Sequence, residues 1–309
     1  MRRAKSWLMM GIGAVLCSWC ASPALADEAS DDTWRSIETP HYTVLSQLGE
    51  RDTRAWAAQF DVFVDSLSGM LGARRADLPP LTVVLFSPES RATAGCAVRL
   101  GTWGLSGTLR RGEGDALRRS MMRAGVRWLT STPEVSQPAW LETGLAEVFS
   151  TFDVRGGHVR WGQPMPDHLA LLRERGLIPL REFLDDPEAV VARDGDARRF
   201  TAQAWALTHL LLLGGDAERR ERVATWLRHP APAAGDAAFR AAFLGDADQL
   251  QRDLAAYVQR PQLGYGMSPR GIVEHKYRIT VASRPAVDAA LGRLSPPSSG
   301  PVVAATTTP

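Results

Sequence analysis

Three kinds of residue are scarce in this chain of 309 amino acids: cysteine, lysine and histidine. Cysteine occurs only at Cys17, Cys20 and Cys96, and the first two lie in an apolar N-terminal stretch. Because one cysteine remains beyond that stretch, no disulfide can form there, and the hydrophobic core must hold the fold. Lysine is limited to Lys5 and Lys276, so arginine carries the positive charge. No later segment supplies the roughly 18 consecutive apolar residues that a transmembrane helix needs.

Histidine is absent between Tyr42 and Gly157, and acidic residues are absent between Ala116 and Pro133. The six histidines fall in different predicted elements: His41, His158, His168, His209, His229 and His275. Zinc sites in proteins depend mainly on imidazole and thiolate ligands that neighbouring elements bring together. The middle of the chain therefore offers zinc no histidine. A metal site assembled from the scattered histidines is the alternative.

The first 26 residues have the pattern of a secretory signal peptide. Arg2, Arg3 and Lys5 give a positive start, an apolar stretch follows, and residues 24–26 (ALA) form a small-x-small cleavage site. Cleavage would remove three basic residues and no acidic ones, so the 36 basic and 34 acidic residues would become 33 and 34. The sequence therefore predicts a periplasmic or secreted protein, nearly neutral after cleavage, without a nucleic-acid partner.

The spacing of apolar residues predicts strands early in the chain and helices later. The predicted strands are His41–Ser46, Leu81–Phe86, Ala97–Leu109 and Tyr277–Val281, with a hairpin over Val154–Trp161. The predicted helices are Asp52–Leu71, Asp115–Leu129, Trp140–Phe152, Asp167–Arg175, Thr201–Leu213, Ala217–Leu227, Asp248–Gln259 and Pro285–Leu294. This order predicts an α+β fold in which a sheet-and-helix part precedes a mostly helical part.

The predicted division of the chain follows the same order. After the signal peptide (1–26), residues 27–160 form an α+β domain and residues 161–260 a helical subdomain. Residues 261–294 supply a short C-terminal strand and helix. Residues 295–309 are rich in Pro, Ser and Thr, and this composition predicts a disordered tail.

The most informative motif is PAWLETGLAEVF at Pro138–Phe149, together with the predicted helix that precedes it. Trp140–Glu147 resembles the WLxEGLAE-like phrase that begins the second site helix in many secreted gluzincin-type zinc peptidases. In that family the first helix carries HExxH, whose two histidines lie one helical turn apart and face the same zinc ion. The glutamate of HExxH activates the bound water, and a glutamate of the second helix is a further ligand.

The resemblance places Thr143 at the ligand glutamate of the second helix. Counting back 19 residues places Ala124 at the second histidine, Ser120 at the first histidine and Met121 at the general-base glutamate. All four chemical positions that the resemblance implies are therefore replaced. A one-residue shift of the alignment would present Glu142, but it supplies no histidine from the preceding helix.

Further segments extend the resemblance to a peptidase-MA-like family over roughly residues 34–260. Thr39–Val44 resembles its opening strand, and Gly162–Leu172 and Phe200–Leu212 resemble its later helical segments. The resemblance implies a zincin-like N-terminal domain, in which a strand borders the substrate cleft. Because the residues at the implied zinc site are not zinc ligands, no cofactor is expected.

The helix aligned with HExxH carries two stripes of side chains. The apolar stripe consists of Leu117, Met121, Ala124 and Trp128, and the basic stripe of Arg119, Arg123 and Arg127. The apolar stripe is expected to fill the former cleft as core, and the alternative is a dry groove that binds a peptide without cutting it. The basic stripe is expected to be a solvated face.

These observations predict a secreted, catalytically inactive metallopeptidase-like protein that binds a peptide or protein in the former cleft. The alternatives are a zinc metallopeptidase with an atypical metal site and a structural periplasmic protein without an open groove. The strand at Ala97–Leu109 is the candidate edge for pairing with an extended ligand. The candidate ligand-binding residues are Trp103, Arg123, Glu142 and Glu147. As the alternative, the two glutamates are helix-surface charges, and Trp128 and Trp140 are expected to pack in the core.

Overall fold

A computed structural model of the protein describes residues 33–73, 78–87, 103–108, 114–131, 137–185, 190–191, 197–214, 217–227, 247–269 and 277–294. The predicted signal peptide, Cys96, His229, His275 and the predicted tail lie outside these ranges. For residues 103–108, 114–117, 269 and 293–294 the description covers the backbone and not the side chains.

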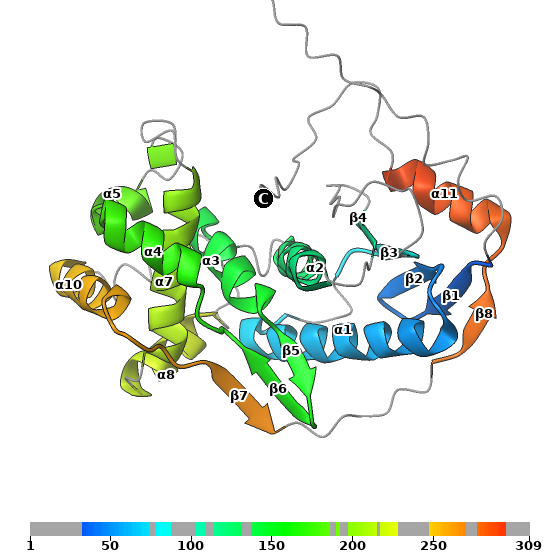
Figure 1. The fold of residues 1–309 in the computed structure, drawn as a ribbon, viewed down its shortest axis with the longest axis horizontal. Helices are drawn as coiled ribbons and strands as arrows, with labels where there is room; N and C mark the ends of the chain where they lie inside the picture. The colour runs from blue at the N-terminus through cyan, green and yellow to red at the C-terminus, as the bar shows by residue number, and fades with distance from the viewer. Residues whose placement is uncertain are drawn as a thin grey trace, which may run out of the picture.

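A five-stranded mixed sheet forms the first part of the fold (Figure 1). Its strands, in spatial order, are β4 (Trp103–Thr108), β3 (Leu81–Phe86), β2 (Tyr42–Ser46), β1 (Arg35–Glu38) and β8 (Ile279–Val281). The pairs β2–β3 and β3–β4 are parallel, whereas β1 is antiparallel to both β2 and β8. A strand from late in the chain therefore completes a sheet that begins at residue 35.

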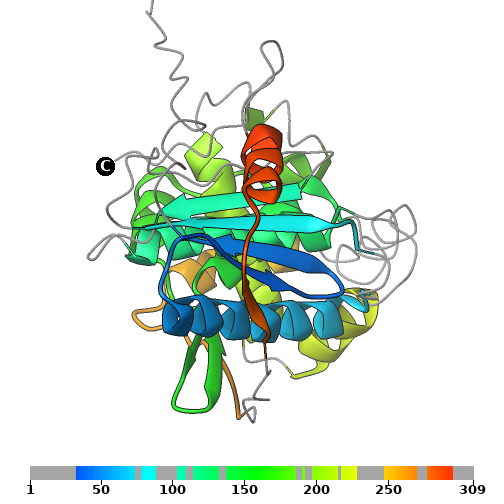
Figure 2. The same ribbon diagram turned by 90° about the vertical axis from the view of Figure 1, so that its right-hand side faces the viewer.

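Alternation of side chains along the strands gives the sheet two apolar faces. Val44 packs in the main core with the apolar side of α1 (Glu50–Leu71). Its neighbour Leu45 belongs to a smaller core that α11 (Arg284–Leu294) covers. Figure 2 shows α1 below the strands and α11 above them. The sheet is therefore enclosed by one helix from each end of the described chain.

The remaining helices build the second part of the fold. Their bounds are α2 (Gly114–Leu129), α3 (Ala139–Ser150), α4 (Pro166–Arg175), α5 (Leu180–Asp185), α7 (Ala197–Leu213), α8 (Ala217–Leu227) and α10 (Ala247–Val258). Helix α3 lies at the centre, packed against both α2 and α7. At Gly144 the approach of α7 is so close that a Cβ would lie 2.0 Å from Oγ1 of Thr208 and 2.5 Å from the backbone oxygen of Ala204.

A small antiparallel sheet follows α3. Its hairpin consists of β5 (Asp153–Arg155) and β6 (His158–Trp161), joined by Gly156 and Gly157 with φ angles of 56° and 76°. Positive φ at both central residues is what a tight two-residue hairpin turn requires, and glycine adopts it without strain. The third strand, β7 (Gly266–Pro269), pairs with β6.

The predicted α+β class, with a sheet-and-helix part before a mostly helical part, is confirmed by this arrangement. The sequence pattern does not reveal β1, β7 or α5, because segments of four to six residues carry too little periodicity. The strand predicted at Tyr277–Val281 is confirmed only for its last three residues. The proposed domain boundaries stay a prediction.

Within the described ranges, no helix combines the length and the apolar composition that a bilayer crossing requires.

Candidate functional site

The segments that resemble a zinc-peptidase site meet where α2 packs against α3, a contact that we call the α2/α3 seam. The two helices run antiparallel, because residues later in α2 pair with residues earlier in α3. Arg123 pairs with Glu147, and Arg127, one turn further along α2, pairs with Glu142. Thr143 lies one turn before Glu147, on the same side of α3.

Three arginines of α2 form ion pairs with carboxylates of α3 and of the strand that follows it. The pairs of this arginine ladder are Arg118–Asp153, Arg123–Glu147 and Arg127–Glu142, with N–O distances of 3.0, 2.7 and 3.8 Å. The middle pair is bidentate, because Nε and Nη2 of Arg123 donate to the two carboxylate oxygens at 2.7 and 2.8 Å. Two of these pairs link α2 to α3, and the pair Arg118–Asp153 links α2 to β5.

Glu147 is the buried centre of this ladder, with 6% of its surface exposed. Its Oε2 also lies 3.2 Å from Nε2 of His168, which projects from α4. Burial raises the pKa of the Glu147 carboxyl, but hydrogen bonds from His168 and Arg123 outweigh it and hold the pKa below its ordinary value. Glu147 is therefore a carboxylate at neutral pH, and it ties α2, α3 and α4 together.

The four positions aligned with the zinc-peptidase site do not fit zinc. Ser120, Met121 and Ala124 are buried, and Thr143 is half-buried. Two hydroxyls, a thioether and a methyl group are not a donor set that holds Zn²⁺. The guanidinium of Arg123 projects from the same turn of α2 and would repel a divalent cation. The cation beside these positions is an arginine bound to Glu147.

Two expectations about these helices are wrong. The basic stripe is not a solvated face throughout, since Arg123 is partly buried and bound to Glu147 of α3, whereas Arg127 is exposed. Of that stripe, only Arg119 forms no ion pair within the described part of the chain. Glu147 is not a surface charge, because it is enclosed between three helices. Opposite charges on two adjacent helices could have suggested the pairing, but the sequence does not fix their register.

Glu142 is closer to the surface charge that the sequence predicts. Its side chain is 36% exposed and that of Arg127 is 43% exposed. Burial raises the pKa of Glu142, and the positive charge of Arg127 offsets part of that effect. A pair 3.8 Å long between two partly exposed groups contributes little to stability.

Trp128 and Trp140 pack in the core, as predicted. Trp128 is fully buried, and its Nε1 donates to the backbone oxygen of Pro79 at 2.8 Å. Trp140 stacks on Trp226 with ring centroids 6.3 Å apart. The backbone of Trp103 begins β4, but its side chain is outside the description. Among the strands that the structure describes, β4 pairs with β3 alone and lies at the sheet edge.

A buried histidine that sequence reasoning does not single out joins three elements. His209 of α7 lies 2.7 Å (Nε2) from the backbone oxygen of Gly162 and 2.8 Å (Nδ1) from the hydroxyl of Tyr257. The carbonyl requires a proton on Nε2, so Nδ1 accepts from Tyr257. Burial lowers the pKa of His209 to about 4, and burial raises the pKa of Tyr257 to about 12. Both groups are therefore neutral at physiological pH, and their role is structural.

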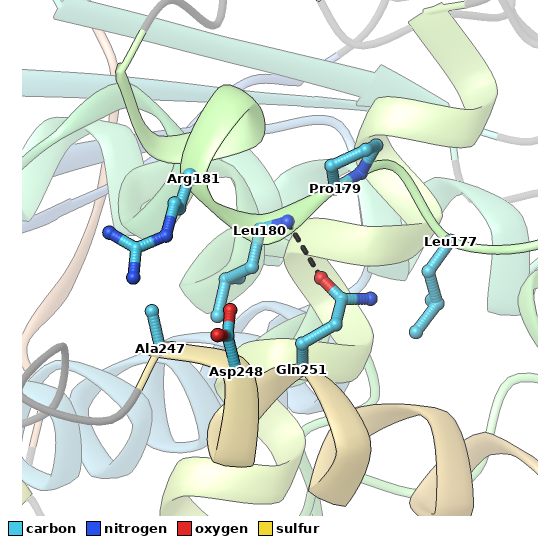
Figure 3. A pocket seen from close by; sticks show the side chains of 7 residues that line it. All are labelled: Leu177, Pro179, Leu180, Arg181, Ala247, Asp248 and Gln251. Atoms are coloured by element: carbon cyan, nitrogen blue, oxygen red, sulfur yellow. Dashed lines mark hydrogen bonds between the residues drawn. The ribbon is translucent and has the colours of Figure 1, made fainter.

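A surface pocket of about 370 Å³ lies between the start of α5 and the start of α10 (Figure 3). Its lining residues are Leu177, Pro179, Leu180, Arg181, Ala247, Asp248 and Gln251. The Gln251 amide oxygen accepts a hydrogen bond from the backbone N–H of Leu180 at 2.6 Å. None of the four aligned positions lines this pocket, so it is separate from the α2/α3 seam.

The described ranges hold no group of three or more His, Cys, Asp or Glu side chains arranged to bind a metal ion.

Comparisons with known proteins give distant structural similarity alone. The chain matches no model of a protein family, and no curated protein sequence matches it. Among solved structures, it is similar to the crystal structure of an M1 zinc metallopeptidase from Deinococcus radiodurans, with 12% sequence identity and a TM-score of 0.35. The match covers 75% of this chain and 54% of the other, so the chain spans about half the length of that protein. A similarity of this size does not identify a family.

Proposed function

We propose that this protein is a secreted, metal-free relative of gluzincin-type peptidases that binds a peptide or protein without cleaving it. The sequence resemblance at Trp140–Glu147 supports the ancestry, and the replaced residues support the loss of chemistry. The observation that carries the proposal is the bidentate Arg123–Glu147 ion pair in the α2/α3 seam.

The ion pair supports a metal-free state for an electrostatic reason. In a zinc peptidase, the positive charge between the two site helices is a metal ion that the side chains share. Here a guanidinium of the protein itself neutralises the buried carboxylate, and His168 adds a further donor. The helices are linked without a metal ion, and no group at the aligned positions supplies zinc-bound hydroxide.

The edge strand β4 is the candidate site for the ligand. An edge strand presents backbone N–H and C=O groups that an extended peptide pairs with by adding a further strand. Helix α2 packs close to β4, so a peptide on that edge would lie near the α2/α3 seam. Such a ligand would be recognised mainly through its backbone, with Trp103 as a candidate side-chain contact.

Proline substitutions on β4 test this mode of binding. Successive residues of a strand direct their N–H groups to opposite edges, so Leu105→Pro and Ser106→Pro remove donors from different edges. The variant that loses a bond to β3 destabilises the sheet. The other stays folded and loses affinity for short fluorescein-labelled peptides of mixed sequence, measured by fluorescence polarisation. Peptide binding unchanged in the folded variant would reject β4 as the site.

A structural role without an open groove is the second candidate. The burial of Ser120, Met121 and Ala124 favours it, because these side chains fill the space that a cleft would need. The same polarisation measurement separates the two. Saturable binding of any labelled peptide supports a peptide-binding function. If no peptide in the mixture binds, the structural role is supported.

A peptidase with an atypical metal site is the third candidate, and the metal content and peptidase activity of the native protein test it. Rebuilding the family's site tests the alignment on which the proposal depends. The variant carries Ser120→His, Met121→Glu, Ala124→His and Thr143→Glu, with Arg123→Ala added to remove the competing cation. If the alignment is right, this variant binds zinc and the native protein does not. Zinc-dependent cleavage by the native protein would support the peptidase.

A further inference from the structure

The base of the β5–β6 hairpin contains a carboxylate surrounded by guanidinium groups. Oδ1 of Asp153 lies 3.0 Å from Nη1 of Arg118. Oδ2 lies 2.7 Å from Nε of Arg155 and 2.9 Å from Nη2 of Arg160. The Asp153 side chain is only 8% exposed, so one buried negative charge contacts three arginines, from α2, β5 and β6.

The charges of this cluster do not cancel. Even with Arg118 left aside, two guanidinium groups share Oδ2 of one carboxylate. Within the part of the chain that the structure describes, neither Arg155 nor Arg160 pairs with a second carboxylate. A single arginine would neutralise Asp153, so the second of these two exceeds what burial of that carboxylate requires.

Arg155 and Arg160 also retain hydrogen-bond donors. Each of these two guanidinium groups has five N–H groups and directs one nitrogen at Asp153. The Nε of Arg160 is buried and has no acceptor among the described groups. The cluster is open on the side of Arg155, whose side chain is 71% exposed, compared with 29% for Arg160. Arg155 and Arg160 are thus two fixed cations with donors that no described group occupies.

We propose that Arg155 and Arg160 form a binding site for an oxyanion, with Asp153 as the positioning residue that holds the two guanidinium groups together. The ligand chemistry is a carboxylate or a phosphate group, because the planar fork of arginine matches the paired oxygens of both. The site lies outside the four aligned positions of the α2/α3 seam, so it stands whether or not the protein binds a peptide along β4.

Calorimetric titration of the whole purified protein tests the site. The two probes are inorganic phosphate and N-acetyl-Glu-Glu, each titrated at constant ionic strength against a chloride reference. The site predicts saturable binding of at least one probe. Tighter binding of the dipeptide assigns the site to carboxylates, and tighter binding of phosphate assigns it to phosphoryl groups.

Matched variants distinguish a specific anion-binding site from a general effect of the protein's net charge. Arg155→Gln, at an exposed position, is expected to weaken binding about tenfold, because it removes a charged hydrogen-bond donor to the anion. Arg252→Gln on α10 removes the same charge from another exposed position and is expected to leave the affinity within about twofold. Equal weakening by both variants, or no saturable binding of either probe to the native protein, overturns the proposal.

The variant Asp153→Asn tests the positioning role. Because Asp153 holds the guanidinium groups in place, a folded Asp153→Asn protein is expected to bind the anion more weakly than the native protein. Should Asp153→Asn fail to fold, Arg155→Gln still decides the question, because Arg155 lies at the surface. A folded Asp153→Asn protein that binds the probe as tightly as the native protein would contradict the positioning role of Asp153.

Discussion

The guanidinium of Arg123 on α2 and the carboxylate of Glu147 on α3 form two parallel hydrogen bonds, of 2.7 and 2.8 Å, across the seam between the two helices. The resemblance to zinc peptidases places metal ligands in these same two helices. A protein-borne cation beside those positions explains how a carboxylate of the α2/α3 seam stays ionised and buried without a metal ion.

Breaking this pair from one side should be costly. Arg123→Gln leaves Glu147 buried with His168 as its remaining partner, and the free energy of unfolding is expected to fall by about 2 kcal/mol. Arg222→Gln, which removes an arginine paired with the exposed Glu218 on α8, is expected to cost less than about 0.5 kcal/mol. Urea unfolding measures both values.

The double variant Arg123→Gln/Glu147→Gln sharpens the same test. It removes the buried charge together with its partner, so it should lose less stability than Arg123→Gln alone. If the double variant lost at least the sum of the two single losses, the account of Glu147 as a carboxylate dependent on Arg123 would fail.

The close packing of α3 on α7 predicts that Gly144 does not tolerate a methyl group. Gly144→Ala would place a Cβ 2.5 Å from the backbone oxygen of Ala204, which cannot rotate away. The expected loss is about 3 kcal/mol, at the upper end for overpacking. Gly69→Ala on α1 is the matched control: no atom lies within 4 Å of the added methyl group, and alanine favours the helix. Similar unfolding midpoints for the two variants would show that α3 and α7 pack less closely.

His209 predicts a pH dependence of stability. Its pKa is lowered from 6.5 to about 4, so the unfolded chain takes up a proton that the folded protein resists. The neutral form therefore contributes stability that is fully present above about pH 6.5 and is lost as the pH falls to about 4. The full difference amounts to roughly 3 kcal/mol.

The control for His209 is a variant that does not titrate. His209→Gln can still donate to Gly162 and accept from Tyr257, but it should show a shallower decline in unfolding free energy between pH 6.5 and 4. In both proteins, the lowered pKa of Glu147 also decreases the unfolding free energy as the pH falls below 4.5, the ordinary pKa of a glutamate. Parallel pH profiles for the native protein and His209→Gln would contradict the assignment of this decline to His209.

The elements with long periodic patterns were predicted correctly from the sequence. The apolar spacing of Asp52–Leu71 and the β-branched run Leu81–Phe86 predicted α1 and β3 nearly to the residue. The paired glycines at 156–157 predicted the hairpin, because positive φ at both positions suits glycine. These features depend on neighbouring residues alone, so they can be predicted from the sequence.

Contacts between segments far apart in the chain could not be predicted from the sequence. Glu147 and Arg123 lie 24 positions apart, and this spacing does not indicate whether the two side chains form an ion pair or are exposed to solvent. The same holds for His209, whose two partners lie 47 and 48 positions away. Burial of a charge depends on how helices pack, and helix register is a tertiary property.

The role of the C-terminal segment is a further consequence of tertiary packing. Val287 of α11 is buried against the second face of the sheet in one cluster with Trp34 and Phe86. Val287→Asp would place a carboxylate in that apolar cluster and is expected to cost about 3 kcal/mol or more. Ala286→Asp, its exposed neighbour in the first turn of α11, should change stability by less than about 0.5 kcal/mol. Unfolding of both variants, followed by tryptophan fluorescence, compares them, and equal values would show that α11 is dispensable for the sheet.

Zinc content of the purified protein is the most direct measurement of the central claim. The protein is incubated with zinc, dialysed, and analysed for metal by mass spectrometry, with the rebuilt-site variant in parallel. A negligible amount of zinc per chain, and no loss of stability on chelation, is the expected result. The account would be contradicted if each native chain bound about one zinc ion, and if a chelator removed that zinc and abolished peptide cleavage.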